Sequence, residues 1–201
     1  VKVALAFPDV YEVAMSHLGL KIIYSVLNAR EDALAERVYA PWVDMEAMMR
    51  EKHIPLFSLE NKCPVKDFDV LGFTMPYEMC YTNILNMIDM AGIPVWAKDR
   101  SDEDPLVVAG GPCVYNAEPV ADFFDVFFIG ESEEAIGEMV DIVKAWKAEG
   151  KPGGRKEAIR RLAQIDGCYA PSLYEVSYYE CYRMIHFFTL LVEHGIGEVV
   201  V

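Results

Sequence analysis

The stretch VVAGGPCVYNAEPVADFFDVFFIGESEEAI, residues 107–136, decides the fold class of this chain. Two short apolar runs, 106–109 and 126–129, are typical of central parallel strands that are covered on both faces. Glycines follow both runs, as Gly110-Gly111 and as Gly130. Such glycines let the backbone turn with positive φ and let a ligand approach closely, outside the carboxyl ends of the strands. The stretch therefore predicts the ligand-binding edge of a parallel sheet.

The rest of the chain alternates strand and helix patterns around this stretch. Further strands are expected over 1–7, 37–40 and 68–74, and amphipathic helices separate them, one of which passes through Tyr81 and stops at Gly92. A plain linker at 151–154 precedes a last helical piece at 155–163. This alternation predicts a doubly wound, mostly parallel α/β sheet of the flavodoxin-like or cobalamin-binding-domain-like kind, in three αβα layers.

Several residues carry helix-start signals. Asp9, with Glu12 three residues later, forms a capping-box pattern for the first helix, and Ser16 is a competing start. Pro41 is expected as the first residue of a short helix, and Ser132 as the cap of the helix that ends near Gly150.

Composition bounds the class of protein. The chain has 201 residues, of which 53% are hydrophobic and 25% charged, enough for one domain with a sound core. A formal net charge of −14 without a Lys/Arg cluster argues against nucleic-acid binding. Five scattered cysteines suit reduced thiols inside a cell. With no secretory or targeting segment in view, we expect a cytoplasmic domain that binds neither membrane nor nucleic acid.

The opening stretch also carries a family pattern, which runs Gly-Gly-Pro, Asn-x-Glu-Pro, Phe-Phe-Asp and Gly-Glu-x-Glu-Glu. It is similar to the amino-terminal cobalamin-binding-like domain of radical SAM proteins. Three further blocks, at 7–24, 41–60 and 67–94, resemble one fused, poorly characterised subfamily. The resemblance covers 1–178, and 179–201 is an unassigned tail that could equally be a truncation or an artefact. The pattern consists of Gly110, Gly111, Pro112, Asn116, Glu118, Pro119, Phe123, Phe124, Asp125, Gly130, Glu131, Glu133 and Glu134.

The resemblance implies a cofactor and sets a limit on how it is held. Cobalamin domains of the methionine-synthase type use an Asp-x-His-x-x-Gly loop, a Ser/Thr after the third strand and a Gly-Gly pair. Thr74 and Gly110-Gly111 match, whereas His17 has Met15 and Leu20 where the aspartate and glycine belong. A carboxylate partner normally orients a ligating imidazole. The resemblance therefore implies a base-off, His-off cobalamin, or no cobalamin.

In a flavodoxin-like order the loops 7–9, 74–77 and 110–113 converge at the switch point between the first and third strands. We predict a cofactor-binding set there and at the next strand end. Some members also have a structural interpretation: a tight turn for Gly110-Gly111, a helix start for Asp9 and Thr74, and the positive helix end for Glu131. Cys113 is expected to be a buried hydrophobe and His17 a hydrogen-bonded helix residue. The set is Pro8, Asp9, Thr74, Tyr77, Gly110, Gly111, Pro112, Gly130 and Glu131.

A radical SAM cluster needs closely spaced cysteines, and this chain has none. The closest pair, Cys168 and Cys181, is thirteen residues apart, so the Cys-x-x-x-Cys-x-x-Cys loop of the family is missing. The 4Fe-4S cluster and S-adenosylmethionine are therefore expected in a downstream barrel domain of the full-length protein, and this chain alone is expected to be inactive.

Three hypotheses for function stay open at this point. The predicted set binds a cobalamin-like tetrapyrrole or the substrate of the barrel. Alternatively, the domain is an interaction scaffold that covers the barrel's active site. In the third hypothesis it binds an independent small molecule such as a flavin.

Overall fold

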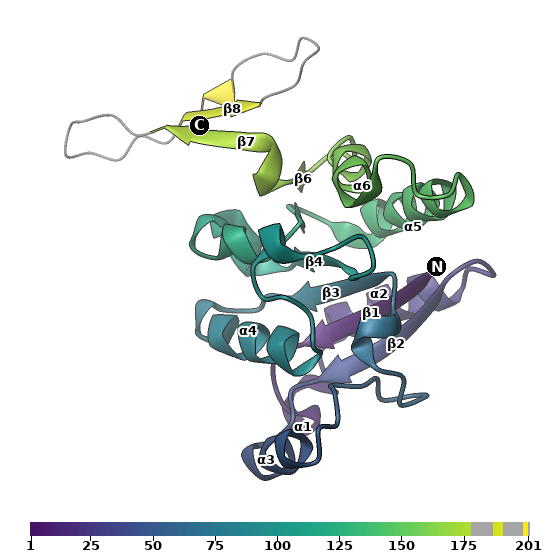
Figure 1. The fold of residues 1–201 in the computed structure, drawn as a ribbon, viewed down its shortest axis with the longest axis vertical. Helices are drawn as coiled ribbons and strands as arrows, with labels where there is room; N and C mark the ends of the chain where they lie inside the picture. Colours follow the sequence, from purple (N-terminus) through teal and green to yellow (C-terminus); the bar gives the residue numbers. More distant parts are fainter. Residues whose placement is uncertain (178–186, 191–198, 201) are drawn as a thin grey trace.

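The computed structural model describes residues 1–177, 187–190 and 199–200. A six-stranded sheet with the order β2-β1-β3-β4-β5-β6 forms the main body (Figure 1). The first five strands are parallel and β6 pairs antiparallel with β5. This order confirms the predicted doubly wound, mostly parallel, flavodoxin-like sheet. Its strands are β1 (Lys2–Phe7), β2 (Leu34–Tyr39), β3 (Val70–Thr74), β4 (Leu106–Gly110), β5 (Val126–Phe128) and β6 (Cys168–Tyr169).

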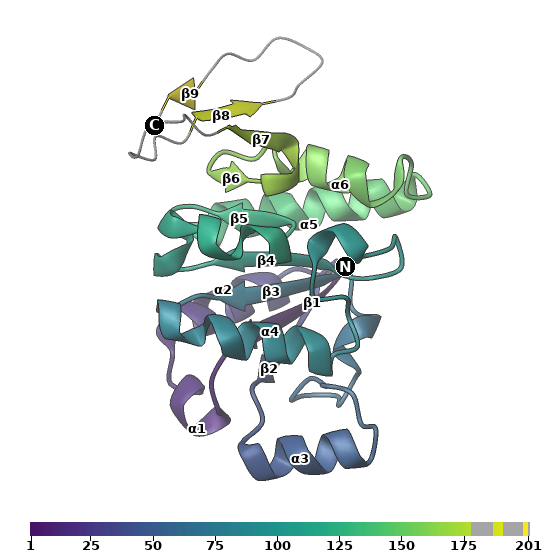
Figure 2. The same ribbon diagram turned by 60° about the vertical axis from the view of Figure 1, so that its left-hand side comes forward.

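Helices cover both faces of the sheet, which gives the three-layer arrangement seen in Figure 2. α2, α5 and α6 pack on one face, while α3, α4 and short 3₁₀ segments pack on the other. The α-helices are α1 (Tyr11–Ala14), α2 (Leu18–Asn28), α3 (Val43–Glu51), α4 (Tyr81–Met90), α5 (Ser132–Ala148) and α6 (Gly154–Leu162). The 3₁₀ segments are η1 (Val65–Asp67), η2 (Glu78–Cys80), η3 (Ala97–Asp99), η4 (Pro112–Asn116), η5 (Glu118–Phe123) and η6 (Pro171–Leu173).

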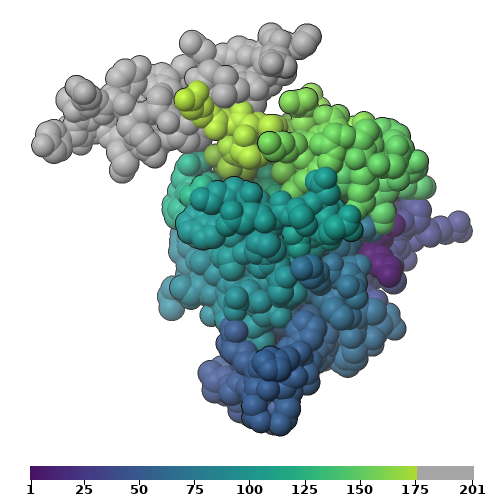
Figure 3. All heavy atoms as spheres, viewed as in Figure 1, coloured from purple at the N-terminus to yellow at the C-terminus, as the bar shows by residue number. Residues whose placement is uncertain are grey.

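Strand alternation divides the core into two hydrophobic clusters. In β1, Val3, Leu5 and Phe7 face α2 and α5, whereas Ala4 and Ala6 face α4. Side chains that alternate along a strand point to opposite faces, so a strand buried on both sides is apolar throughout. The described body is elongated, with α3 at one end of its long axis and α6 toward the other (Figure 3). No helix among the described residues is long and apolar enough to cross a membrane.

The first predicted helix is split in two, and its predicted cap is wrong. α1 ends at Ala14 and α2 begins at Leu18, and neither Asp9 nor Ser16 caps them. The Nδ1 atom of His17 accepts the backbone N–H of Leu20 at 3.1 Å, so an imidazole caps α2. A local capping-box pattern did not predict this outcome, because an imidazole nitrogen can satisfy the same unpaired donor.

Two other predicted helix starts are shifted. α3 begins at Val43 with Trp42 at its cap position, so Pro41 is not its first residue as predicted. Glu131 occupies the cap position of α5, so Ser132 is the first helical residue and not the cap. Gly92, with φ of 69°, follows the end of α4 as predicted. α6 begins one residue before the expected 155 and ends one residue before 163.

Both edges of the main sheet are covered. Beside β2, the backbone N–H of Leu59 donates to the carbonyl of Arg37 at 2.7 Å, and the Glu60 carboxylate accepts the Arg37 N–H at 2.8 Å. The short antiparallel β6 covers the edge of β5. Fewer unpaired backbone N–H and C=O groups are therefore exposed at the two edges. A second sheet contains β7 (Tyr174–Ser177), β8 (Phe187–Leu190) and β9 (Val199–Val200). Most of the unassigned tail at 179–201 lies outside the described residues.

Candidate functional site: the carboxyl edge of the sheet

The five parallel strands end at one edge of the sheet, which we call the crest. In the register, Thr74 pairs with Gly110 and Gly110 with Phe128, so the three ends lie level. Parallel strands necessarily gather their following loops at the same edge, where ligands of open α/β sheets bind. The crest consists of loops 8–17, 40–45, 75–80, 111–117 and 129–134.

All nine residues of the predicted set lie at or next to the crest. Pro8 and Asp9 follow β1, while Thr74 and Gly110 end β3 and β4. The topology thus brings together the residues that the sequence singled out, although it does not test whether they bind a ligand. The remaining members, Tyr77, Gly111, Pro112, Gly130 and Glu131, lie in the loops that follow β3, β4 and β5.

Hydrogen bonds connect the two loops at the switch point. The Tyr77 hydroxyl donates to the Asp9 carboxylate at 3.1 Å, and the Asn83 amide of α4 donates to the carbonyl of Pro8 at 3.0 Å. Burial, followed by the hydrogen bond to Asp9, raises the pKa of Tyr77, so the hydroxyl stays protonated and remains a donor. Asp9 therefore links the β1 loop to the β3 loop instead of capping a helix.

The three glycines of the crest differ in what surrounds them. Gly111 has φ of 109°, and an added Cβ atom would lie 3.0 Å from the Met75 carbonyl oxygen and 3.1 Å from its nitrogen. Its close neighbour is therefore protein backbone. A Cβ atom on Gly110 would meet the Ser132 hydroxyl at 3.4 Å, whereas Gly130, with φ of 113°, has nothing within 4 Å. Of these three, Gly130 faces open space.

His17 lies beside the crest but is already engaged. Its Nδ1 atom caps α2, and its ring packs against Phe7 with the centroids 4.8 Å apart. Burial lowers the pKa of His17, so the imidazole is neutral at neutral pH. His17 Nδ1, the loops joined by Tyr77 and Asp9, and the space beside Gly111 are thus all engaged in contacts within the chain.

We expect His17→Ala to leave any cobalamin affinity of the full-length protein within about threefold, because no carboxylate orients the ring toward a metal. The same change should lower the free energy of unfolding by about 1 kcal/mol through loss of the α2 cap. Absorbance titration and chemical denaturation measure the two effects. An affinity loss of about tenfold or more in a variant that still folds would show that His17 is a ligand.

Two thiols next to the crest are buried. Burial raises the pKa of both Cys80 and Cys113, and the nearby Glu78 carboxylate raises that of Cys113 further. Cys113 is 9% exposed, as expected of a small hydrophobe. Throughout the part of the chain that the structure describes, no three His, Cys, Asp or Glu side chains are placed to hold a metal ion.

Large apolar side chains are exposed along the crest. Met79 is 87% exposed, Tyr115 75% and Trp42 63%. Large exposed apolar side chains that gather at one edge are typical of binding surfaces in soluble proteins. Other exposed members of the same loops are Tyr11, Val13, Met15, Val43, Met45, Tyr77 and Ile129.

One end of the crest is hollowed into a groove of about 690 Å³ between α1, α3 and the 56–62 loop. Aromatic walls come from Tyr11, Tyr39 and Trp42, and Tyr11 and Tyr39 meet edge to face with centroids 5.4 Å apart. Lys62, at the rim, donates to the Leu59 carbonyl at 2.8 Å. Its volume lies in the range of small-molecule sites, and its mostly apolar lining is typical of them.

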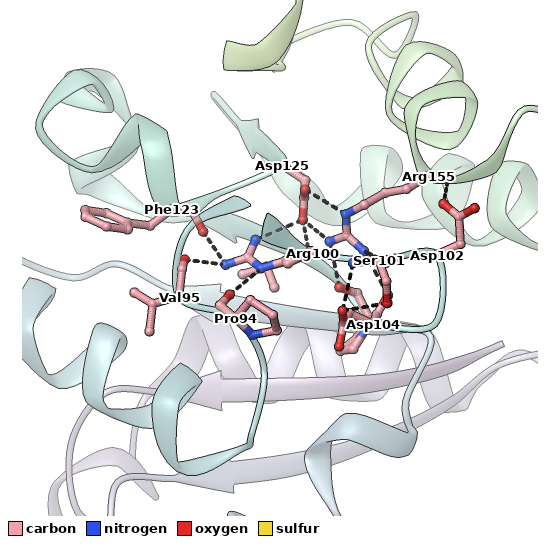
Figure 4. Close-up of polar contacts among 11 residues, drawn as sticks. Pro94, Val95, Arg100, Ser101, Asp102, Asp104, Phe123, Asp125 and Arg155 are labelled. Atoms are coloured by element: carbon pink, nitrogen blue, oxygen red, sulfur yellow. Dashed lines mark hydrogen bonds and ion pairs between the residues drawn. The ribbon is translucent and has the colours of Figure 1, made fainter. Parts of the chain in front are cut away.

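At the opposite edge of the sheet, Asp125, Arg100 and Arg155 form a buried network of ion pairs (Figure 4). The sequence analysis did not predict this network. The Asp125 carboxylate, 2% exposed, accepts from Arg100 Nη1 at 3.2 Å, from Arg155 Nε at 3.1 Å and from the Val107 N–H at 2.7 Å. Remaining guanidinium donors reach backbone carbonyls, including those of Pro94 and Pro105. Asp125, part of the Phe-Phe-Asp pattern, is therefore structural.

A second residue of the family pattern is also structural. Glu118 accepts a hydrogen bond from the Tyr169 hydroxyl at 2.5 Å, which ties η5 to β6. The sequence signal that could have identified both residues is a carboxylate within an apolar run, because buried charges are paired in stable proteins. The identity of their partners could not be read from that signal.

Comparison with known proteins gives one family and one relative. A family described as the N-terminal part of radical SAM proteins matches residues 19–171. An uncharacterized protein of Methanocaldococcus jannaschii is 30% identical over 134 residues, which cover 65% of this chain and 24% of that protein. The aligned part therefore spans about a quarter of the length of the relative.

Proposed function

This chain belongs to the family of N-terminal domains of radical SAM proteins, and on that premise we propose that its crest docks against the cluster-bearing domain of the full-length protein. In this role the domain is an accessory scaffold that covers the active site of its neighbour. The supporting observation is the row of exposed apolar side chains along the crest, headed by Met79 at 87% exposure. Tyr, Trp and Met are enriched at protein interfaces, and these three residue types supply most of that row.

The geometry favours docking over a buried cofactor. Gly111 packs on the Met75 backbone, and the Tyr77–Asp9 hydrogen bond spans the switch point. The β1 loop is also unsuited to the phosphate of a flavin nucleotide. Pro8 offers no N–H, and the Asp9 and Glu12 carboxylates would repel an anion. The chain's own residues therefore serve best to orient a neighbouring surface and to exclude water from it.

A ligand role has support at one place, the groove between α1 and α3. Its volume of about 690 Å³ and its aromatic walls suit part of a large ligand, such as a base-off cobalamin or the substrate of the neighbouring domain. Cobalamin and flavin both absorb visible light. Purification of the full-length protein with a stoichiometric visible chromophore that Trp42→Ala removes would favour this second function over the scaffold.

Site-specific crosslinking tests the docking. A photo-crosslinking amino acid, p-benzoylphenylalanine, replaces Met79 in the full-length protein, and the matched control carries it at the exposed Glu103 on the opposite edge. After irradiation and proteolysis, we expect crosslinks from position 79 to peptides of the cluster-bearing domain and none from position 103. Absence of such crosslinks at 79 in folded protein would refute the docking.

A further inference from the structure

The crest has an unusual charge pattern. Its five loops contain no lysine and no arginine, although they come from five separate parts of the chain; Lys62, which lines the groove at one end of the crest, lies outside these loops. His17, the single residue there that could become cationic near neutral pH, has its pKa lowered by burial and is neutral at pH 7. The same loops carry seven carboxylates, namely Asp9, Glu12, Asp44, Glu78, Glu131, Glu133 and Glu134.

None of these seven carboxylates takes part in an ion pair that the structure describes. At the opposite edge, two carboxylates are paired within the domain. There Asp69 pairs with Lys147 at 2.5 Å and Asp104 with Lys66 at 3.4 Å. Asp67 and Glu103 at that edge have no described ion pair either, so the crest differs in that all seven of its carboxylates lack one.

Exposed aromatic and carboxylate groups lie in the same crest loops. Tyr77 and Met79 flank Glu78, and Tyr11 precedes Glu12. Aromatic faces and carboxylates both attract guanidinium and ammonium groups, and both disfavour phosphate. A crest built this way discriminates against nucleotides, nucleic acids and anionic membranes, and it favours cationic side chains.

We propose that the crest recognises a positively charged protein surface, rich in Arg and Lys around an apolar centre, on the cluster-bearing domain of the same full-length protein. This inference rests on the proposed docking function and adds the chemistry of the partner. Charge complementarity sets the orientation of the two domains, because the crest attracts a basic face and repels an acidic one. The crest extends over all five loops, which suits a protein surface better than a single small molecule.

Charge reversal combined with the Met79 crosslinker tests the inference in the full-length protein. The crest variant carries Glu12→Lys, Glu78→Lys and Glu131→Lys. The control variant carries Asp67→Lys, Asp99→Lys and Glu103→Lys, three exposed carboxylates elsewhere that also have no described ion pair. Both variants change the net charge equally, so that only the position of the change differs.

We expect the crest variant to lose about fivefold or more of the crosslink yield to the cluster-bearing domain, while the control variant stays near wild type. Raising the salt from about 0.05 M to about 0.5 M should reduce the wild-type yield as well. A variant with glutamine at the same three crest positions should give an intermediate loss of crosslink yield. It replaces the lysine variant in the test if circular dichroism shows that the lysine variant does not fold.

The outcomes separate the two proposals. If wild-type protein gives crosslinks whose yield neither charge reversal nor salt changes, the crest docks but not through charge, and this inference is wrong. If wild-type protein gives no crosslinks to the cluster-bearing domain, the docking function itself fails. Higher yield in the crest variant than in wild type would indicate an acidic partner surface and would overturn the inference directly.

Discussion

Asp125→Asn is expected to lower the free energy of unfolding by about 3–5 kcal/mol, because it leaves two buried guanidinium groups without a counter-charge. The side chain of Arg100 is 0% exposed and that of Arg155 8%. Burial lowers the pKa of Arg100; the Asp125 charge opposes this shift, and the neighbouring Arg155 adds to it. Urea denaturation followed by circular dichroism measures the loss.

A matched control for this prediction lies three residues away. Asp122 is exposed and is in no ion pair that the structure describes, so Asp122→Asn removes one carboxylate charge without opening a buried cluster. Its effect should stay within about 0.5 kcal/mol. A loss below about 1 kcal/mol for Asp125→Asn would mean that water or a shifted Arg155 replaces the carboxylate, and that the network does not seal this edge.

The second large effect is expected at the crest. Gly111→Ala should destabilise the domain by about 3 kcal/mol or more, since it adds left-handed backbone strain to a steric overlap with rigid backbone. The added Cβ atom would lie 3.0 Å from the Met75 oxygen, and the Met75 N–H is itself bonded to the Gly110 carbonyl at 2.8 Å. The Met75 segment is therefore poorly able to move away.

Gly130→Ala provides the control, because it shares the strained φ but lacks the contact. The φ values are 109° at Gly111 and 113° at Gly130, and nothing lies within 4 Å of the second position. We expect Gly130→Ala to cost about 1–2 kcal/mol, so that the difference between the two variants reports the contact alone. Equal losses would indicate that the space beside Gly111 is open to a ligand after all.

These glycines also show how far a motif can be interpreted. The Gly-Gly pair after β4 correctly indicated the edge where a site would lie, since strand ends in a parallel sheet gather there. It did not indicate what approaches each glycine. At Gly111 the approaching group is the Met75 backbone, 36 positions earlier in the chain, and no pattern around residue 111 identifies that neighbour.

The candidate site was predicted in part. The sequence analysis placed nine residues at one edge, and all nine lie at or next to the crest. It did not identify the exposed row headed by Met79, nor the absence of cations across five loops. Both properties emerge only when loops distant in sequence are brought to one edge, because no single loop of that length is informative about charge.

What the sequence by itself determined is the order of elements and the shape of the sheet. Apolar runs of strand length, helical periodicity between them and glycines at strand ends are local properties, and crossover handedness then restricts the winding. Even at this level, exact helix starts such as the His17 cap escaped prediction, because several nearby polar groups compete for the same unpaired N–H donors.

Only the tertiary structure decided which polar groups meet. Asp125 finds Arg100 and Arg155 at separations of 25 and 30 residues, and Tyr77 finds Asp9 at 68. The physical reason is that a hydrogen bond or ion pair becomes decisive when its groups lose water, and burial depends on the whole packed sheet. The sequence contained the charges, and the fold determined which of them form ion pairs within the domain and which do not.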